Sequence, residues 1–113
     1  MQKRALIIDD EEEICKLFAV YLEKKNIPSF YALNLNEGLS KFEKYLPDYV
    51  FLDNNLPDGL GISLIKKFKE INPSSKIIVI SAISDLAETA IIEGATGFVD
   101  KPISFQTIDK FII

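Results

Sequence analysis

Four widely separated stretches of this chain carry side chains that suit phosphoryl chemistry. Asp9 and Asp10 are adjacent, and Asp53 stands at the end of an apolar run. Ser81 ends another apolar run, and Lys101 precedes a proline. A carboxylate can attack phosphorus to form an aspartyl phosphate, and clustered carboxylates suit Mg²⁺, which prefers oxygen ligands. An ammonium and a hydroxyl can stabilise the oxygens of a phosphoryl group during its transfer.

These side chains can act together only if the intervening elements bring them to one place. The run at 5–8 is continuously apolar, as expected of a strand that is buried on both faces. The run at 76–81 is the clearest of this kind. Residues 54–61 carry proline, glycine and asparagine and are expected to form a loop. Strands are expected at 5–8, 29–33, 49–52, 76–81 and 97–100.

Amphipathic helices are expected to follow the strands. The first helix is predicted from apolar residues at i, i+3, i+4, i+7 and i+8, with acidic residues in its first turn. Those apolar residues are Ile14, Leu17, Phe18, Tyr21 and Leu22. The later helices are marked by Leu35, Leu39 and Phe42; by Ile62, Ile65 and Phe68; by Ala87, Ala90 and Ile91, between Ser84–Asp85 and Gly94; and by a last start near Ser104.

This alternation predicts an α/β fold, a doubly wound five-stranded parallel sheet of flavodoxin-like type with helices on both faces. In such sheets ligands bind at the carboxyl ends of the strands. With the strand order 2-1-3-4-5, the first and third strands are neighbours, so Asp9, Asp10 and Asp53 converge in one pocket. Ser81 and Lys101 then lie at its far side.

Three converging carboxylates repel one another. Two unit charges 4 Å apart repel by roughly 1 kcal/mol in water and about 4 kcal/mol at an effective dielectric of 20. A hard divalent cation relieves this repulsion, and an all-oxygen site favours Mg²⁺.

Composition excludes several other classes of protein. The chain has 113 residues, 48% of them hydrophobic and 27% charged, which fits one globular domain. A net charge of −4 disfavours direct binding to nucleic acid or to an anionic membrane. The chain has no histidine, which excludes Ser-His catalysis and phosphohistidine carriage, and no apolar run of membrane-spanning length. A single cysteine, Cys15, allows no internal disulfide and fits a cytoplasmic location.

The chain resembles the receiver domains of two-component response regulators, with a chemotaxis-regulator-like fold, over essentially its whole length. No single motif is decisive, but all of them occur in order at the expected strand ends. The matching motifs are Leu6-Ile7-Ile8-Asp9-Asp10, Phe51-Leu52-Asp53, Leu56-Pro57-Asp58-Gly59-Leu60-Gly61, Ile80-Ser81-Ala82, Gly94-Ala95 and Lys101-Pro102.

The resemblance implies a role for each site residue. Asp53 would be the phosphoacceptor and Asp10 the direct Mg²⁺ ligand, whereas Asp9 would act on the metal mainly through water. The main-chain carbonyl of Asn55 would complete the metal site. Ser81 would be the switch hydroxyl, Lys101 the phosphate-binding lysine in a cis Lys-Pro peptide, and Phe98 the switch aromatic.

The resemblance also implies partners and an output. A sensor histidine kinase or a histidine phosphotransfer protein would donate the phosphoryl group to Asp53. Ser81 would then move inward and Phe98 would follow, which remodels the surface of the fourth helix, fifth strand and fifth helix. The chain would catalyse only its own phosphorylation and dephosphorylation. Homodimerisation on phosphorylation is common in the family.

Residues 1–113 are expected to form a single receiver domain. The apolar ending at 111–113 fits either a truncated last helix or a natural stop, and an effector module beyond residue 113 is compatible with the first.

Four positions depart from the commonest family pattern. Ser81 and Phe98 stand where threonine and tyrosine are frequent, and Glu11 and Asp100 add charge beside the expected site. Taken singly, the site residues have plainer interpretations, such as helix-start acids, a turn residue, a helix cap, surface charge and core packing. Their joint occurrence at neighbouring strand ends favours the site.

Three other functions share parts of this pattern. A flavodoxin-like cofactor binder needs a phosphate-cradling loop after the first strand, where this chain has acids. An aspartyl-phosphate hydrolase would also use Asp and Mg²⁺, but in a larger chain with a cap. A pseudo-receiver, which binds without being phosphorylated, is disfavoured because every key side-chain type is present.

Overall fold

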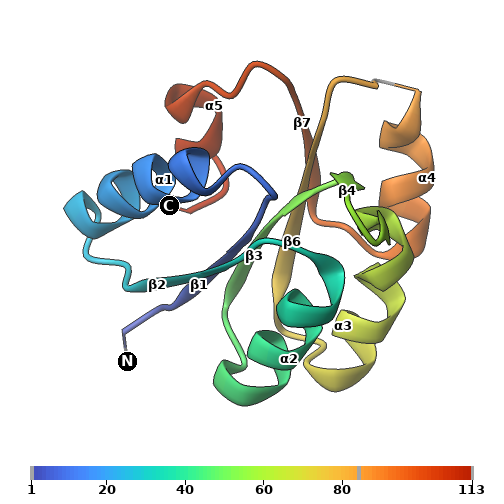
Figure 1. The fold of residues 1–113 in the computed structure, drawn as a ribbon, viewed down its shortest axis with the longest axis horizontal. Coiled ribbons are helices and arrows are strands. Elements are labelled where there is room, and N and C mark those ends of the chain that lie inside the picture. Colours follow the sequence, from blue (N-terminus) through green and yellow to red (C-terminus); the bar gives the residue numbers. More distant parts are fainter. Residues whose placement is uncertain (1, 84, 113) are drawn as a thin grey trace.

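Five parallel strands form the central sheet of the computed structural model, which describes residues 2–83 and 85–112 (Figure 1). Their order is β2-β1-β3-β6-β7, which confirms the predicted doubly wound topology. β1 therefore lies between β2 and β3, so the chain reverses its direction of travel across the sheet at β1. The strands are β1 (Ala5–Ile8), β2 (Ser29–Ala32), β3 (Tyr49–Asp53), β6 (Lys76–Ser81) and β7 (Gly97–Asp100).

Helices cover both faces of this sheet (Figure 1). α1 (Glu12–Lys24) and α5 (Phe105–Asp109) pack on one face, in a core that includes Phe18 and Phe51. The other face carries α2 (Leu35–Tyr45), α3 (Ile65–Ile71) and α4 (Leu86–Glu93), in a core that includes Phe42 and Phe68. Successive strand residues point to opposite faces, so one sheet supports two separate cores.

The buried stripe of α1 differs from the predicted one. Cys15, Phe18 and Leu22 are buried, whereas Leu17 is 56% exposed. The stripe that contacts the sheet is centred on Phe18 and Leu22 and extends to Cys15, which lies on the side away from Leu17. The expectation that Leu17 faces the core is therefore wrong, and Cys15 lies in the buried stripe instead.

The segment after β3 is more ordered than the predicted loop. It forms a two-stranded antiparallel hairpin, β4 (Asn55–Leu56) and β5 (Gly59–Leu60). A 3-10 turn, η1 (Gly61–Leu64), then precedes α3, so the third helix starts later than its apolar pattern predicts. Gly61 explains the tight turn, because a Cβ there would overlap the main-chain oxygen of Asp53.

The last two helices begin where the sequence predicts, but α5 ends at Asp109, earlier than expected. α4 ends at Gly94, whose φ of 116° is a left-handed conformation that favours glycine. Ser84, expected to open α4, lies outside the described residues, as does the terminal Ile113. α5 starts directly after Ser104, as expected. Within the part of the chain that the structure describes, no helix combines the length and apolarity needed to span a membrane.

Cys15 should resist thiol reagents in the folded protein. Its side chain is fully buried, its Sγ donates to the main-chain oxygen of Asp9 at 3.4 Å, and burial raises the thiol pKa to about 12. Only the thiolate is an effective nucleophile, so iodoacetamide should leave the native chain unmodified and alkylate it in urea. Intact mass measured before and after unfolding tests this, and stoichiometric labelling of the native chain would contradict the burial.

Candidate functional site

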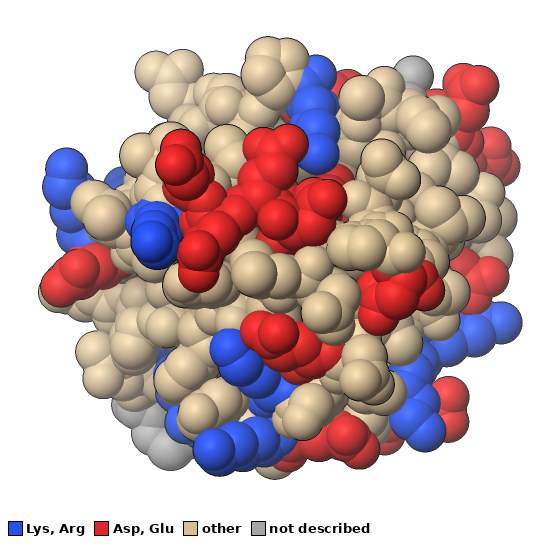
Figure 2. Space-filling model, viewed as in Figure 1, with Lys and Arg blue, Asp and Glu red and all other residues tan. Residues whose placement is uncertain are grey.

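The carboxyl ends of β1 and β3 bring three aspartates together. Asp9 and Asp10 follow β1, and Asp53 is the last residue of the neighbouring β3. Each offers one carboxylate oxygen, and these three oxygens lie within 4.8 Å of one another. Asp9 and Asp53 are buried, whereas Asp10 is exposed, so the cluster opens to solvent on one side. Figure 2 shows acidic side chains gathered on the surface near the start of α1.

Lys101 reaches this cluster from the loop after β7. Its Nζ lies 2.9 Å from Asp53 Oδ1, and it follows Asp100, the last residue of β7. The approach is an ion pair rather than a well-directed hydrogen bond. Burial acts to lower the pKa of the ammonium, but the Asp53 carboxylate outweighs it and the Lys101 pKa is raised, so the side chain stays charged. The Lys101–Pro102 peptide is cis, as the family resemblance implies.

Asp9 shows that the cluster is electrostatically strained. Only 5% of Asp9 is exposed, and its Oδ1 accepts a hydrogen bond from the Glu11 main chain at 2.9 Å. Burial raises the pKa of Asp9 to about 6, and the nearby Asp53 carboxylate acts in the same direction. A divalent cation would remove this strain, and three carboxylates are a suitable donor set for Mg²⁺. The residues therefore fit the metal that the family resemblance implies.

Asp9→Asn should stabilise the metal-free protein at neutral pH. The pKa of Asp9 is about 6 in the folded state against 3.8 for the free group, so ionised Asp9 destabilises the fold above about pH 6. The penalty disappears as the pH falls below about 4, where both states are protonated. The shift corresponds to at most about 3 kcal/mol, and local relaxation reduces it, so the expected gain is about 1–3 kcal/mol.

Urea unfolding of the wild type and Asp9→Asn in EDTA measures this difference in the free energy of unfolding. It should be largest at neutral pH, much smaller at about pH 4, and absent at lower pH. A variant that is less stable than the wild type at neutral pH would contradict the strain at Asp9.

Ser81 and Asn55 share a cavity with Asp53. The cavity has a volume of about 210 Å³, and Lys101 also lines it. Ser81 ends β6, is buried, and accepts a hydrogen bond at its Oγ from the Ile83 main chain at 3.1 Å. Asn55 lies in β4 with its side chain exposed. The structure thus brings the hydroxyl, the ammonium and the expected phosphoacceptor to one opening.

Phe98 lies apart from this cavity. It sits on β7 opposite Val79 and is half-buried against the core shared with α2, α3 and α4. Its ring does not line either pocket beside Asp53. The structure therefore places Phe98 two strands away from Asp53, with β6 between them, on the face that carries α4.

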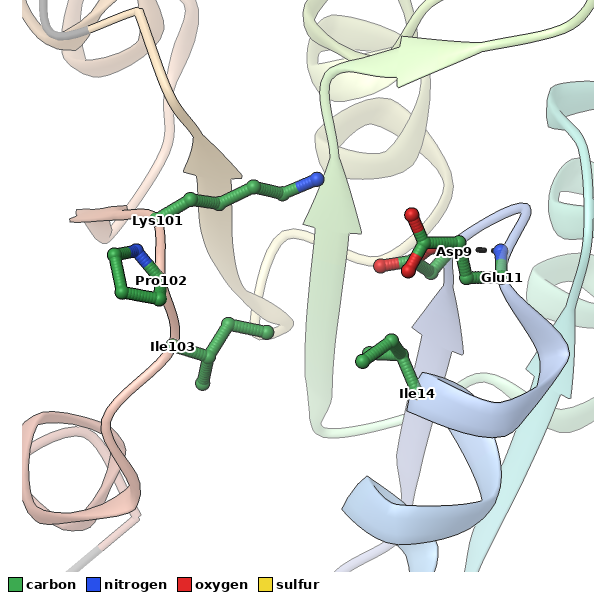
Figure 3. A pocket seen from close by; sticks show the side chains of 6 residues that line it. All are labelled: Asp9, Glu11, Ile14, Lys101, Pro102 and Ile103. Atoms are coloured by element: carbon green, nitrogen blue, oxygen red, sulfur yellow. Dashed lines mark hydrogen bonds between the residues drawn. The ribbon is translucent and has the colours of Figure 1, made fainter.

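A second pocket opens on the other side of Lys101. It has a volume of about 180 Å³, and Figure 3 shows Lys101 extended toward the acidic cluster while Asp9 faces it across the opening. The remaining lining is mostly apolar, from Ile14, Pro102 and Ile103. The acidic cluster is thus reached from a polar opening and from a partly apolar one.

Asn54 is a site residue that the sequence analysis missed. Only 2% of it is exposed, and it lines the cavity of Asp53. Its Oδ1 accepts a hydrogen bond from the Ile62 main chain at 2.9 Å. Its position directly after Asp53 was the only signal in the sequence, and the pair Asn54-Asn55 is equally typical of a turn.

Comparison with known proteins gives consistent matches. A family model described as the response regulator receiver domain matches residues 5–113. The chemotaxis protein CheY of Thermotoga maritima is 35% identical over 105 residues, which cover 90% of this chain and 88% of that protein. The transcriptional regulatory protein DpiA of Escherichia coli is 29% identical over 116 residues, covering 94% of this chain and 50% of DpiA.

Solved structures agree with the sequence comparisons. The beryllofluoride-activated NtrC4 receiver domain dimer is 34% identical, with a TM-score of 0.90 over 98% of this chain and 93% of that one. The chain spans about half the length of the first curated relatives that it matches.

Proposed function

Because the chain belongs to the response regulator receiver family, we propose that it accepts a phosphoryl group onto Asp53 and switches a protein-interaction surface in response. The donor is the phosphohistidine of a sensor histidine kinase or of a histidine phosphotransfer protein. One observation carries the proposal: Asp53, at the end of β3, is held among Asp9, Asp10 and Lys101 at the carboxyl edge of the sheet.

The proposed transfer exchanges one bond for another. An oxygen of Asp53 attacks phosphorus, and the phosphorus–nitrogen bond of the donor breaks, with its electron pair leaving on the imidazole nitrogen. Lys101 is placed to hold the phosphoryl oxygens, because its ammonium already lies beside Asp53. Hydrolysis of the aspartyl phosphate by water returns the original carboxylate. The chain acts on its own phosphorylation state and not on a metabolite.

The proposed metal site uses residues already close together. Asp10, Asp53 and the main-chain carbonyl of Asn55 would hold Mg²⁺, and Asp9 would act mainly through water. When bound, the ion neutralises charge on the transferring phosphoryl group. The ion would also stabilise the ionised form of Asp9, whose pKa is raised by burial and, to a smaller extent, by the Asp53 carboxylate.

The proposed switch starts at Ser81. Its hydroxyl oxygen accepts a hydrogen bond from the Ile83 main-chain N–H. If the hydroxyl reoriented toward a phosphoryl oxygen, it would give up this hydrogen bond and donate one to the phosphoryl group. Phe98, half-buried on β7, would then move into the vacated space and remodel the surface of α4, β7 and α5. A partner protein or a second copy of this chain would bind that surface.

We propose that residues 1–113 form one receiver domain, an arrangement that is compatible with an effector module beyond residue 113. The longer relatives support this arrangement, since this chain spans only half of DpiA. Direct binding of nucleic acid or membrane by this domain is not proposed, because its net charge is −4. We further propose that the chain acts in the cytoplasm, together with its kinase partner.

Incubation with acetyl phosphate and Mg²⁺ tests the function. We expect the intact mass to rise by one acid-labile phosphoryl group, mapped to Asp53, and EDTA to prevent it. Folded protein that takes up no phosphoryl group with Mg²⁺ present would indicate a pseudo-receiver instead. A flavin spectrum in the purified protein would favour a cofactor binder.

A further inference from the structure

The loop of residues 54–61 leaves β3 directly after Asp53 and returns to it. Its base is closed by Asn54, whose main-chain oxygen accepts from Gly61 N at 2.9 Å and whose Oδ1 accepts from Ile62 N at 2.9 Å. The Asn54 N–H donates to the main-chain oxygen of Ile80 on β6 at 3.1 Å. Gly61 packs so closely on Asp53 that a Cβ would not fit. The two ends of the loop are therefore fixed to the phosphoacceptor strand.

The tip of the same loop is tied to the start of α2. Asp58 accepts two main-chain hydrogen bonds with its two carboxylate oxygens, from Leu35 N at 2.8 Å and from Asn36 N at 3.0 Å. Both donors lie in the first turn of α2, where N–H groups lack partners within the helix. The Leu35 hydrogen bond is the main cause that holds the pKa of Asp58 below its usual value.

Packing at the tip supports the same contact. Leu56 is buried in the core that contains Leu35. Gly59 adopts a φ of +145°, and a Cβ there would lie 3.0 Å from Leu35 Cδ1. The hairpin thus lies directly on the first residue of α2, and a larger side chain at Gly59 would crowd Leu35 and strain the main chain.

Asn55 lies between these two anchors. Its side chain is exposed, and its neighbours Asn54 and Leu56 are both buried. It pairs across the hairpin with Leu60, which is itself 53% exposed. The position of the Asn55 main chain is therefore set by the anchored residues on either side.

We propose that Asp58 is a positioning residue for the metal site, because it ties the tip of loop 54–61 to α2 and thereby holds the Asn55 main-chain carbonyl beside Asp53. The inference rests on the proposed function, in which that carbonyl is a metal ligand. Asp58 itself touches neither the metal nor the phosphoryl group.

A plainer role for Asp58 would be to cap α2, and Asn34 provides the matched control. Asn34 is the N-cap of the same helix, and its Oδ1 accepts from Glu37 N at 2.8 Å. That side-chain bond lies within α2 and its cap. Loss of Asn34 should therefore loosen the start of α2 without releasing the tip of the loop.

Calorimetric titration with Mg²⁺ distinguishes the two roles in the wild type, Asp58→Ala, Asp58→Asn and Asn34→Ala. We expect Asp58→Ala to weaken Mg²⁺ binding about 10-fold, as for other residues that support metal ligands. Asp58→Asn should weaken it less, because one acceptor oxygen remains. Asn34→Ala should lower the melting temperature and leave the Mg²⁺ dissociation constant unchanged. Hydrogen exchange at the Asn55 and Leu60 amides should accelerate only in the Asp58 variants.

Each other outcome counts against the inference. If folded Asp58→Ala bound Mg²⁺ as tightly as the wild type, this inference would be overturned and the proposed function would stand. If Asn34→Ala weakened Mg²⁺ binding as much as Asp58→Ala does, Asp58 would act only as a cap of α2. If Asp58→Ala does not fold, Asp58→Asn decides by the same criteria. A wild type that binds no Mg²⁺ would overturn the proposed function together with this inference.

Discussion

Asp53→Asn is expected to abolish phosphoryl uptake while preserving the fold. The amide has the shape of the carboxylate but is a poor nucleophile, so labelling by acetyl phosphate should fall by at least about 1,000-fold. The side chain is almost fully buried at the end of β3, where an isosteric replacement keeps the packing. Intact mass and acid-labile phosphate measure the loss, and circular dichroism checks the fold.

The matched control for this substitution is Asp100→Asn. Asp100 is also the last residue of a strand, but its side chain is exposed and takes no part in the acidic cluster. The Asp100→Asn variant should take up the phosphoryl group from acetyl phosphate as the wild type does. Phosphoryl uptake by Asp53→Asn at the wild-type level, or mapping of the wild-type label to another residue, would show that Asp53 is not the acceptor.

The convergence of Asp9 and Asp53 could be predicted because it depends only on strand order. Continuous apolar runs identified β1 and β3 as buried parallel strands, and each run stops at an aspartate. Once the two strands are neighbours, their ends must meet at one edge. The same reasoning places Ser81, and Lys101 follows β7 at that edge.

The contacts within the loops could not be predicted in this way. The bidentate contact of Asp58 with α2 joins residues 22 and 23 positions apart, and no periodicity reports it. The exposure of Leu17 has a similar origin, because the helical pattern of α1 allows two adjacent stripes and only packing against the sheet selects one. Likewise, the raised pKa of Asp9 depends on burial, which residue types alone do not determine.

Lys101→Met should change metal binding and phosphoryl transfer in opposite directions. Methionine keeps much of the apolar stem but removes the ammonium that lies 2.9 Å from Asp53. Without that charge, the three carboxylates should bind Mg²⁺ more tightly, because less of their negative charge is neutralised. Transfer from acetyl phosphate should nevertheless slow by about 100-fold, since a donor to the phosphoryl oxygens is lost.

The free energy of unfolding is a third, independent measurement on Lys101→Met. Removal of one partner leaves the buried Asp53 carboxylate uncompensated, and Lys101 is one-third exposed, so we expect a loss of about 1–2 kcal/mol in EDTA. The control is Lys66→Met. Lys66 forms a surface ion pair with Glu93 at 3.3 Å, and its loss should leave Mg²⁺ affinity, transfer rate and the free energy of unfolding nearly unchanged. If Mg²⁺ affinity and transfer rate fell together in Lys101→Met, the lysine would act by holding the site in shape. If only transfer fell while affinity rose, its charge would act on the phosphoryl group itself.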